Sequence, residues 1–133
     1  MNRLTLENAI VTAVNTALNP TVLNVQRVLD FEDWFTAAVN QDMPAILTKI
    51  TLIQGTSNFM YYGDVTIEVR FLHIKDDSNV TTLEGYKTTV LSYFADHNIS
   101  GLNAKVLFTG ESTYQVRGNF MYVSQFYQTQ LIA

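Results

Sequence analysis

Apolar residues recur at helical spacing in two stretches of the chain. In the first stretch, residues 4–18, they fall four apart on one stripe that ends before Pro20: Leu6, Ile10, Val14 and Leu18. The second stripe follows residue 81: Leu83, Tyr86, Val90, Leu91 and Phe94. The pattern predicts two amphipathic helices, each with one face for a core. The second helix is predicted to begin at a capping box formed by Thr81 and Glu84, after a polar loop over 76–79, and to stop near 98–101.

Alternation of apolar and polar residues predicts the strands. It is strictest between Phe59 and Phe71, where Val65 and Ile67 share one face and Glu68 points to the other. Other strands are predicted at 22–29, 45–53, 102–109 and 114–128, with turns at 54–57 and 110–112. A short helix or ordered loop is expected after Asp30.

The predicted order is therefore helix, strands, helix, strands. Short links and clean alternation favour an α+β fold, with a mostly antiparallel, curved β-sheet and two main α-helices packed on one face. A chain of 133 residues with 47% apolar residues suits one compact domain, so we expect a single domain over 1–133.

Large apolar side chains also occupy the strand face that two helices would leave open. The tetrapeptide NFMY occurs twice, at 58–61 and 119–122, and each copy places aromatic rings on one face and a methionine on the other. A second apolar face needs a cover, which is either a neighbouring subunit or the sheet itself, curled into a partly closed barrel. On this ground we nominate six residues for an oligomer or partner interface: Trp34, Phe35, Met60, Tyr62, Met121 and Tyr127.

Composition narrows the classes of function. The net charge is −4, and the eight Lys and Arg residues are scattered, which argues against a protein that binds a phosphate backbone. The absence of cysteine excludes disulfides and thiolate chemistry. No apolar stretch reaches the length of a membrane span, and the first residues lack the apolar run of a signal peptide.

Catalytic and metal-binding patterns are not found in the sequence. The two histidines, His73 and His97, have no metal or catalytic spacing, and the 76–79 segment lacks the central glycine of a calcium loop. We therefore expect no catalytic, cofactor-binding or metal-binding residues, no cofactor and no enzymatic activity.

The order of elements resembles the tail terminator, or tail completion, proteins of long-tailed bacteriophages. Five segments across almost the whole chain carry the resemblance: LENAIVTAVNTAL, the Met43-Pro44-Ala45-Ile46 entry into a strand, YYGDVTIEVRFLHI, TTLEGYKTTVLSYF and MYVSQFYQTQLI. This is a pattern of elements without a signature motif. The helical character of DFEDWFTAAVNQ departs from it, because an extended or looped passage is expected there.

The resemblance implies a structural virion protein at the head-proximal end of the tail, made in the host cytoplasm. Copies of the chain would form a ring, typically a hexamer, that caps the tail tube and stops its polymerisation. The ring would join the tube protein to a head-side connector or stopper protein, and DNA would be passing cargo only. The resemblance does not exclude another neck adaptor, such as a head completion or stopper protein.

A rival hypothesis from another class is a pocket-bearing domain. A curved sheet with a leading helix is also typical of small ligand-binding domains and enzymes of the nuclear transport factor 2-like type. In that case His73 or Asp64 would lie at the mouth of a pocket.

Overall fold

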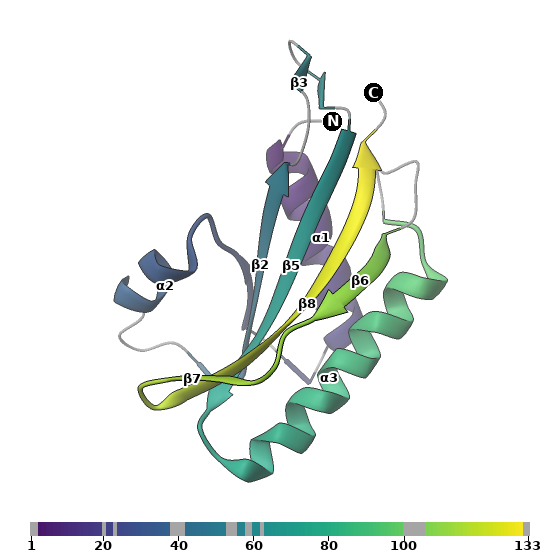
Figure 1. The fold of residues 1–133 in the computed structure, drawn as a ribbon. Coiled ribbons are helices and arrows are strands. Elements are labelled where there is room, and N and C mark those ends of the chain that lie inside the picture. The colour runs from purple at the N-terminus through teal and green to yellow at the C-terminus, as the bar shows by residue number, and fades with distance from the viewer. Residues whose placement is uncertain are drawn as a thin grey trace.

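The computed structural model describes residues 3–19, 21–22, 24–37, 42–52, 56–57, 60–61, 63–99 and 106–131. Three helices lie within these ranges: α1 (Arg3–Leu18), α2 (Phe31–Ala37) and α3 (Asp77–Asp96). Figure 1 shows a twisted sheet with α1 and α3 on one side and α2 at the opposite side.

The described strands are β1 (Asn24–Arg27), β2 (Ala45–Leu52), β3 (Thr56–Ser57), β4 (Met60–Tyr61), β5 (Gly63–Ile74), β6 (Leu107–Glu111), β7 (Gln115–Arg117) and β8 (Phe120–Leu131). Six of them form one sheet in the order β1-β2-β5-β8-β6, with β7 also paired to β8, while β3 and β4 form a separate hairpin. Only the β1–β2 pair is parallel. The predicted α+β class with a mostly antiparallel sheet is confirmed.

The described sheet is open. Strands β1 and β6 lie at its two ends and do not pair with each other. The alternative of a partly closed barrel that buries both faces is therefore wrong for the described strands.

The main core lies between the sheet and the two long helices. The predicted stripe of α1 is buried, as are Leu83, Val90 and Phe94 of α3. These side chains pack on one face of the central strands, formed by Val65, Ile67, Val69, Phe71, Met121, Val123 and Tyr127. The prediction that two main helices share one face is confirmed.

A smaller core lies on the opposite face, under α2. Its buried members are Val28, Phe31, Trp34, Ala45, Leu47 and Leu72. The segment after Asp30 is thus helical, and it supplies from within the same chain part of the cover that the second face needs. Asp30 begins this helix by accepting a hydrogen bond from the Glu32 backbone amide at 2.7 Å.

Helix α3 starts earlier than the capping box predicts. Asp76 has extended backbone angles, and its side chain accepts a hydrogen bond from the Ser78 backbone amide at 2.9 Å, so Asp76 is the N-cap. The expected polar loop over 76–79 is therefore mostly the first turn of the helix. Thr81 lies inside α3, and the Glu84 carboxylate accepts a hydrogen bond from the Lys87 side chain instead of capping the helix.

The predicted strand 114–128 is two strands. Gly118 has φ of 58°, a left-handed conformation that glycine adopts without steric cost, and it turns the chain between β7 and β8. The predicted turn at 110–112 is wrong for its first two residues, since Gly110 and Glu111 belong to β6 and pair with β8 after a register shift between Phe108 and Gly110. Strands β6 and β7 consequently follow each other along the same side of β8.

Candidate functional site

Two of the nominated interface residues belong to the main core. Met121 is 5% exposed and Tyr127 is fully buried, with its hydroxyl donating to Gln125 Oε1 at 2.7 Å. The Tyr127 ring packs edge-on against Phe94, 4.8 Å between centroids. The expectation that these side chains are exposed is wrong, because Met121 and Tyr127 lie on the helix-covered face while Phe120 and Tyr122 lie on the opposite one.

Trp34 and Phe35 lie on α2, over the second face. Trp34 is 9% exposed and donates through Nε1 to Gln26 Oε1 at 3.2 Å, so its expected exposure is wrong as well. Phe35 is half-buried, and its ring lies 6.3 Å from that of Phe120 and 6.3 Å from that of Tyr122. Both residues fasten α2 to its own sheet.

The remaining two nominated residues lie in or beside the small hairpin. Met60 belongs to β4, and Tyr62 lies outside the described residues. A role for any of the six at an oligomer or partner interface stays a prediction.

An arginine stacked between two aromatic rings occupies the second face. The guanidinium carbon of Arg70 lies 3.7 Å from the Phe31 ring centroid and 4.3 Å from that of Tyr122. The same guanidinium donates from Nη2 to Glu68 Oε2 at 3.0 Å, and the Ser124 hydroxyl donates to that oxygen at 2.7 Å. Because all the hydrogen bonds described for this cluster are internal, it is suited to positioning α2 rather than to catalysis.

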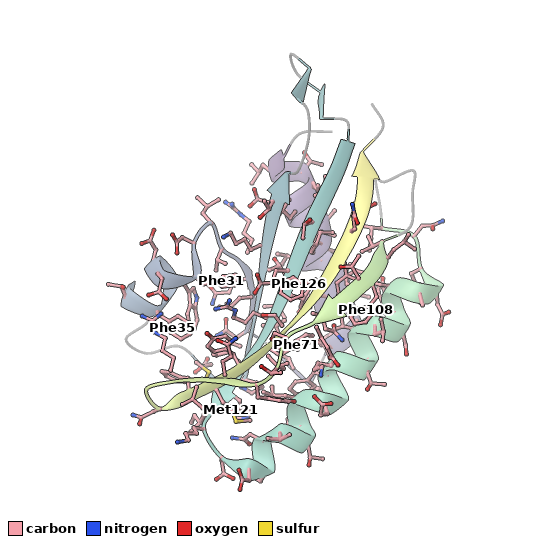
Figure 2. All side chains as sticks on the ribbon, viewed as in Figure 1. Phe31, Phe35, Phe71, Phe108, Met121 and Phe126 are labelled. Atoms are coloured by element: carbon pink, nitrogen blue, oxygen red, sulfur yellow. The ribbon has the colours of Figure 1, made fainter. Side chains whose placement is uncertain are left out.

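A second arginine joins α2 to the β7–β8 hairpin. The guanidinium carbon of Arg117 lies 4.3 Å from the Phe35 ring centroid, and Nη1 forms an ion pair with Glu32. Figure 2 places Phe31 and Phe35 together on this side of the sheet.

A buried lysine connects α3 to β6. Lys87 Nζ lies 2.7 Å from Glu84 Oε2 and 2.6 Å from Glu111 Oε2, with 9% of the lysine side chain exposed. The Tyr114 hydroxyl also donates to Glu84. The Gln125 side-chain amide donates to the Lys87 backbone carbonyl at 3.0 Å, which ties the same turn of α3 to β8.

The proton affinities in this network follow from its contacts. Burial opposes the charge of the Lys87 ammonium, but its hydrogen bonds to Glu111 and Glu84 outweigh that cost and raise its pKa. The hydrogen bonds from Lys87 and Tyr114 lower the pKa of Glu84. Burial, followed by the hydrogen bond to Glu84, raises the pKa of the Tyr114 hydroxyl. At neutral pH the network is therefore held in one protonation state.

The histidines lie apart from these clusters. His73 Nδ1 accepts a hydrogen bond from the Ile74 backbone amide at 2.8 Å, and partial burial lowers its pKa. His97 stacks on Tyr93, 4.1 Å between ring centroids, at the C-terminal cap of α3. Among the described residues, no group of three or more His, Asp or Glu side chains could hold a metal ion.

The described outer face of α1 is uncharged. Every exposed residue described along α1 is uncharged: Leu4, Thr5, Asn8, Thr12, Asn15 and Thr16. Glu7, the acidic residue of this helix, is buried and paired with Arg27 at 2.9 Å. Surface helices usually carry charged residues on their solvent face, so a long uncharged face is unusual.

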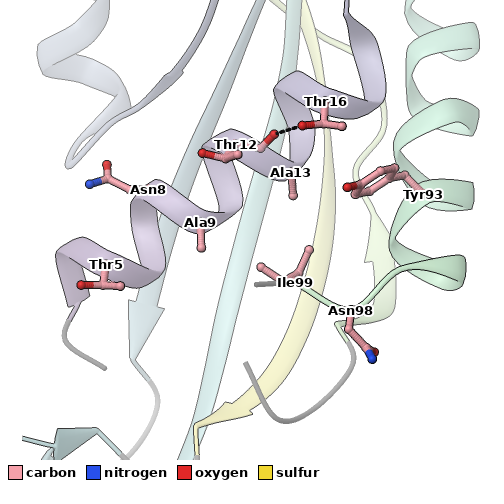
Figure 3. A pocket seen from close by; sticks show the side chains of 9 residues that line it. All are labelled: Thr5, Asn8, Ala9, Thr12, Ala13, Thr16, Tyr93, Asn98 and Ile99. Carbon is pink, nitrogen blue, oxygen red and sulfur yellow. Dashed lines mark hydrogen bonds between the residues drawn. The ribbon is translucent and has the colours of Figure 1, made fainter. Parts of the chain in front are cut away.

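Two pockets open along the seam between α1 and α3. The first, about 370 Å³, lies between the Thr5 to Thr16 stretch of α1 and the end of α3, where Tyr93 and Ile99 point toward the helix (Figure 3). The second, about 410 Å³, lies between the end of α1 and the start of α3. The two helices therefore run antiparallel along the seam. The described lining of the two pockets does not include His73, one of the two residues that the rival pocket hypothesis nominates; the side chain of the other, Asp64, lies outside the described part of the structure.

The end strand β6 exposes two neighbouring apolar side chains. Leu107 is 63% exposed and Phe108 is 42% exposed, and in the described part of the chain no strand pairs with the outer edge of β6. Phe108 extends the aromatic cluster of the core, with its ring 5.7 Å from that of Tyr127.

The sequence analysis predicted neither the uncharged face of α1 nor the exposed apolar pair on β6. The threonine and asparagine positions of α1, which alternate with its apolar stripe, already contained the signal of a helix with no charged outer face. The exposure of Leu107 and Phe108 could not be read from the sequence, because alternation alone does not tell an edge strand from a central one.

Comparison with known proteins places the chain in no group. No protein-family profile and no curated protein matches it. None of the helices within the described residues is long and apolar enough to cross a membrane.

Proposed function

We propose that this protein is a structural subunit that assembles with copies of itself into a ring, as a tail terminator of a long-tailed bacteriophage. The ring caps the tail tube, stops its polymerisation and presents a surface to the head-side connector or stopper protein. DNA passes through it without being bound, and the subunit belongs to the virion, at the head-proximal end of the tail. The α+β architecture is the one that the resemblance implies.

The uncharged outer face of α1, formed by its described exposed residues, carries the proposal. Protein interfaces are depleted of charged residues at their centres, whereas free surfaces of soluble proteins are not. Here the exposed positions described along a 16-residue helix are all uncharged, in a chain with twelve acidic residues. The described uncharged face, from Leu4 to Thr16, is about 18 Å long, which suits contact with another protein.

The described polar clusters support a structural role. Arg70 and Lys87 each lie between partners of the same chain and hold α2, α3 and the sheet together. A subunit whose task is to match surfaces benefits from such rigidity, because little order has to be gained on assembly.

The oligomeric state tests the proposal first. The purified chain is measured by light scattering after size exclusion and by native mass spectrometry, and its particles are viewed by negative-stain electron microscopy. We expect a hexameric ring, formed by the chain alone or on addition of the tube protein encoded in the same genome. A stable monomer that does not bind the tube protein would refute the proposal.

A tube-capping assay separates a terminator from another neck adaptor. The tube protein is polymerised with and without this chain, and tube lengths are measured by electron microscopy. A terminator binds one end of each tube and shortens the length distribution. A ring that leaves tube length unchanged but binds the head-side connector would identify a head completion or stopper protein instead.

A further inference from the structure

The pocket beside Tyr93 has the chemistry of a socket for apolar side chains. Its described lining consists of threonine, asparagine, alanine, tyrosine and isoleucine residues, none of which carries a charge. Ala9, Ala13 and Ile99 supply its apolar walls, as Figure 3 shows. A volume of about 370 Å³ lies within the range that accepts small ligands, so it has room for one or two side chains.

The edge of β6 has the chemistry of a wedge. Leu107 and Phe108 project to opposite sides of the strand, because successive residues of a strand alternate. The strand is short, its pairing with β8 contains a register shift and its last residue is Glu111, features that protect an edge from pairing with another strand. The first two residues, Leu107 and Phe108, are nevertheless large exposed apolar side chains, which favour burial against another surface.

The proposed ring makes a second copy of the same chain the partner, and electrostatics limits where two copies can meet. Each copy carries a net charge of −4, so contact between copies is opposed least where the two surfaces carry no acidic groups. The described lining of the socket and the first four residues of the wedge both meet this condition. A charged side chain buried at either place would lack a described partner and would oppose contact.

We propose that the β6 edge of one copy, through Leu107 and Phe108, inserts into the pocket beside Tyr93 on the next copy. The inference rests on the proposed ring and names its subunit contact. The wedge and the socket are different surfaces, so the contact is heterologous and repeats from copy to copy until a ring closes.

Substitutions on each surface test the contact. Leu107→Lys and Phe108→Lys place a charge on the wedge, and Thr12→Arg places one in the socket at an exposed helical position. Each is expected to raise the dissociation constant of the subunit contact at least about tenfold. Assembly is measured by light scattering and native mass spectrometry, and circular dichroism verifies that each variant folds.

Two matched controls share the substitutions but not the surfaces. Ser92→Arg adds the same charge to an exposed position of α3 that lines neither pocket and lies outside the uncharged face of α1. Val116→Lys replaces an apolar residue that is 58% exposed on β7. Both controls are expected to assemble like the wild type, and equal disruption by a control would overturn the proposed contact.

Mixing the variants distinguishes this contact from a symmetric one. The Leu107→Lys chain keeps its socket and the Thr12→Arg chain keeps its wedge, so an equimolar mixture has one intact contact per pair. We expect the mixture to form dimers and nothing larger. A mixture that stays monomeric, or wedge and socket variants that assemble normally, overturns the contact while leaving the proposed ring in place.

The wild type separates the two proposals. If it assembles and the variants do not, both stand. If it remains monomeric with and without the tube protein, both fail. If it remains monomeric alone and Thr12→Arg abolishes binding to the tube protein, the socket accepts the tube subunit and the contact between copies is wrong.

Discussion

The guanidinium carbon of Arg70 lies 3.7 Å from the centroid of the Phe31 ring. This contact joins the middle of β5 to the start of α2, across the face of the sheet that lacks the two long helices. Since 16% of the Arg70 side chain is exposed, the interaction is mostly removed from water, where contacts between cations and aromatic rings are strongest.

Arg70→Ala is expected to lower the free energy of unfolding by about 2 kcal/mol, because it removes two ring contacts and leaves Glu68 without its cation. Arg70→Lys keeps the charge but loses the planar stacking, at a cost of about 1 kcal/mol. Urea unfolding followed by the fluorescence of Trp34, the single tryptophan, reports the docking of α2 directly. An Arg70→Ala protein as stable as an exposed-surface control, Lys75→Ala, would contradict this account.

Lys87→Met is expected to cost about 2 kcal/mol of unfolding free energy, since two carboxylates lose their shared partner. The double variant Lys87→Met with Glu111→Gln should lose less than the sum of the two single changes, because Lys87 and Glu111 interact directly. Thermal and urea unfolding of the four proteins provide the double-mutant cycle. Additive losses would mean that the 2.6 Å contact contributes no coupling energy.

The stabilisation from Lys87 should depend on pH at both extremes. The folded-state pKa of Glu84 lies below its ordinary 4.5, so its contribution is present above pH 4.5 and is lost as pH falls through the folded-state pKa. The folded-state pKa of Lys87 lies above its ordinary 10.5, so its contribution is present below pH 10.5 and is lost as pH rises further. The stability difference between wild type and Lys87→Met, measured across pH, should be flat between these limits and shrink outside them. A steady slope through neutral pH would disprove this assignment.

Asp76→Ala should lower the urea midpoint, because the first turn of α3 loses the acceptor for its Ser78 amide. Thr81→Ala should leave the midpoint nearly unchanged, since Thr81 is an exposed residue inside the helix. Paired denaturation curves measure both effects. The reverse ranking would restore the capping box at 81–84 as the start of the helix.

The helix start shows how local sequence rules compete. Thr81 and Glu84 match the sequence pattern of a capping box. Asp76 is instead the N-cap, five residues before Thr81, and accepts from the Ser78 amide, while the Glu84 carboxylate accepts hydrogen bonds from Lys87 and Tyr114. Lys87 lies one turn further along the same helix, but Tyr114 comes from the segment between β6 and β7, which no local pattern can reveal. The apolar stripes of α1 and α3 were predictable because burial follows helical periodicity regardless of where the cap lies.

The two faces of β8 show the same limit of local sequence patterns, here for the nominated interface residues. Alternation correctly separates Phe120 and Tyr122 from Met121 and Tyr127. It does not say which of the two faces the long helices cover, so Met121 and Tyr127 were predicted to be exposed and are core residues. Local patterns could not predict that α2 covers the second face either, because the strand residues packed under it come from β2, β5 and β8.

The pairing of β5 with β8 also decides when the protein can fold during its synthesis. All twelve residues of β5 pair with β8, which is translated 46 or more residues later, after α3 and β6. Until β8 leaves the ribosome, Val65, Ile67 and Phe71 lack the neighbours that complete their layer. The nascent chain therefore carries an unpaired apolar strand edge while at least 46 further residues are added. The emergence of β8, rather than helix formation, is the step that removes this risk of aggregation.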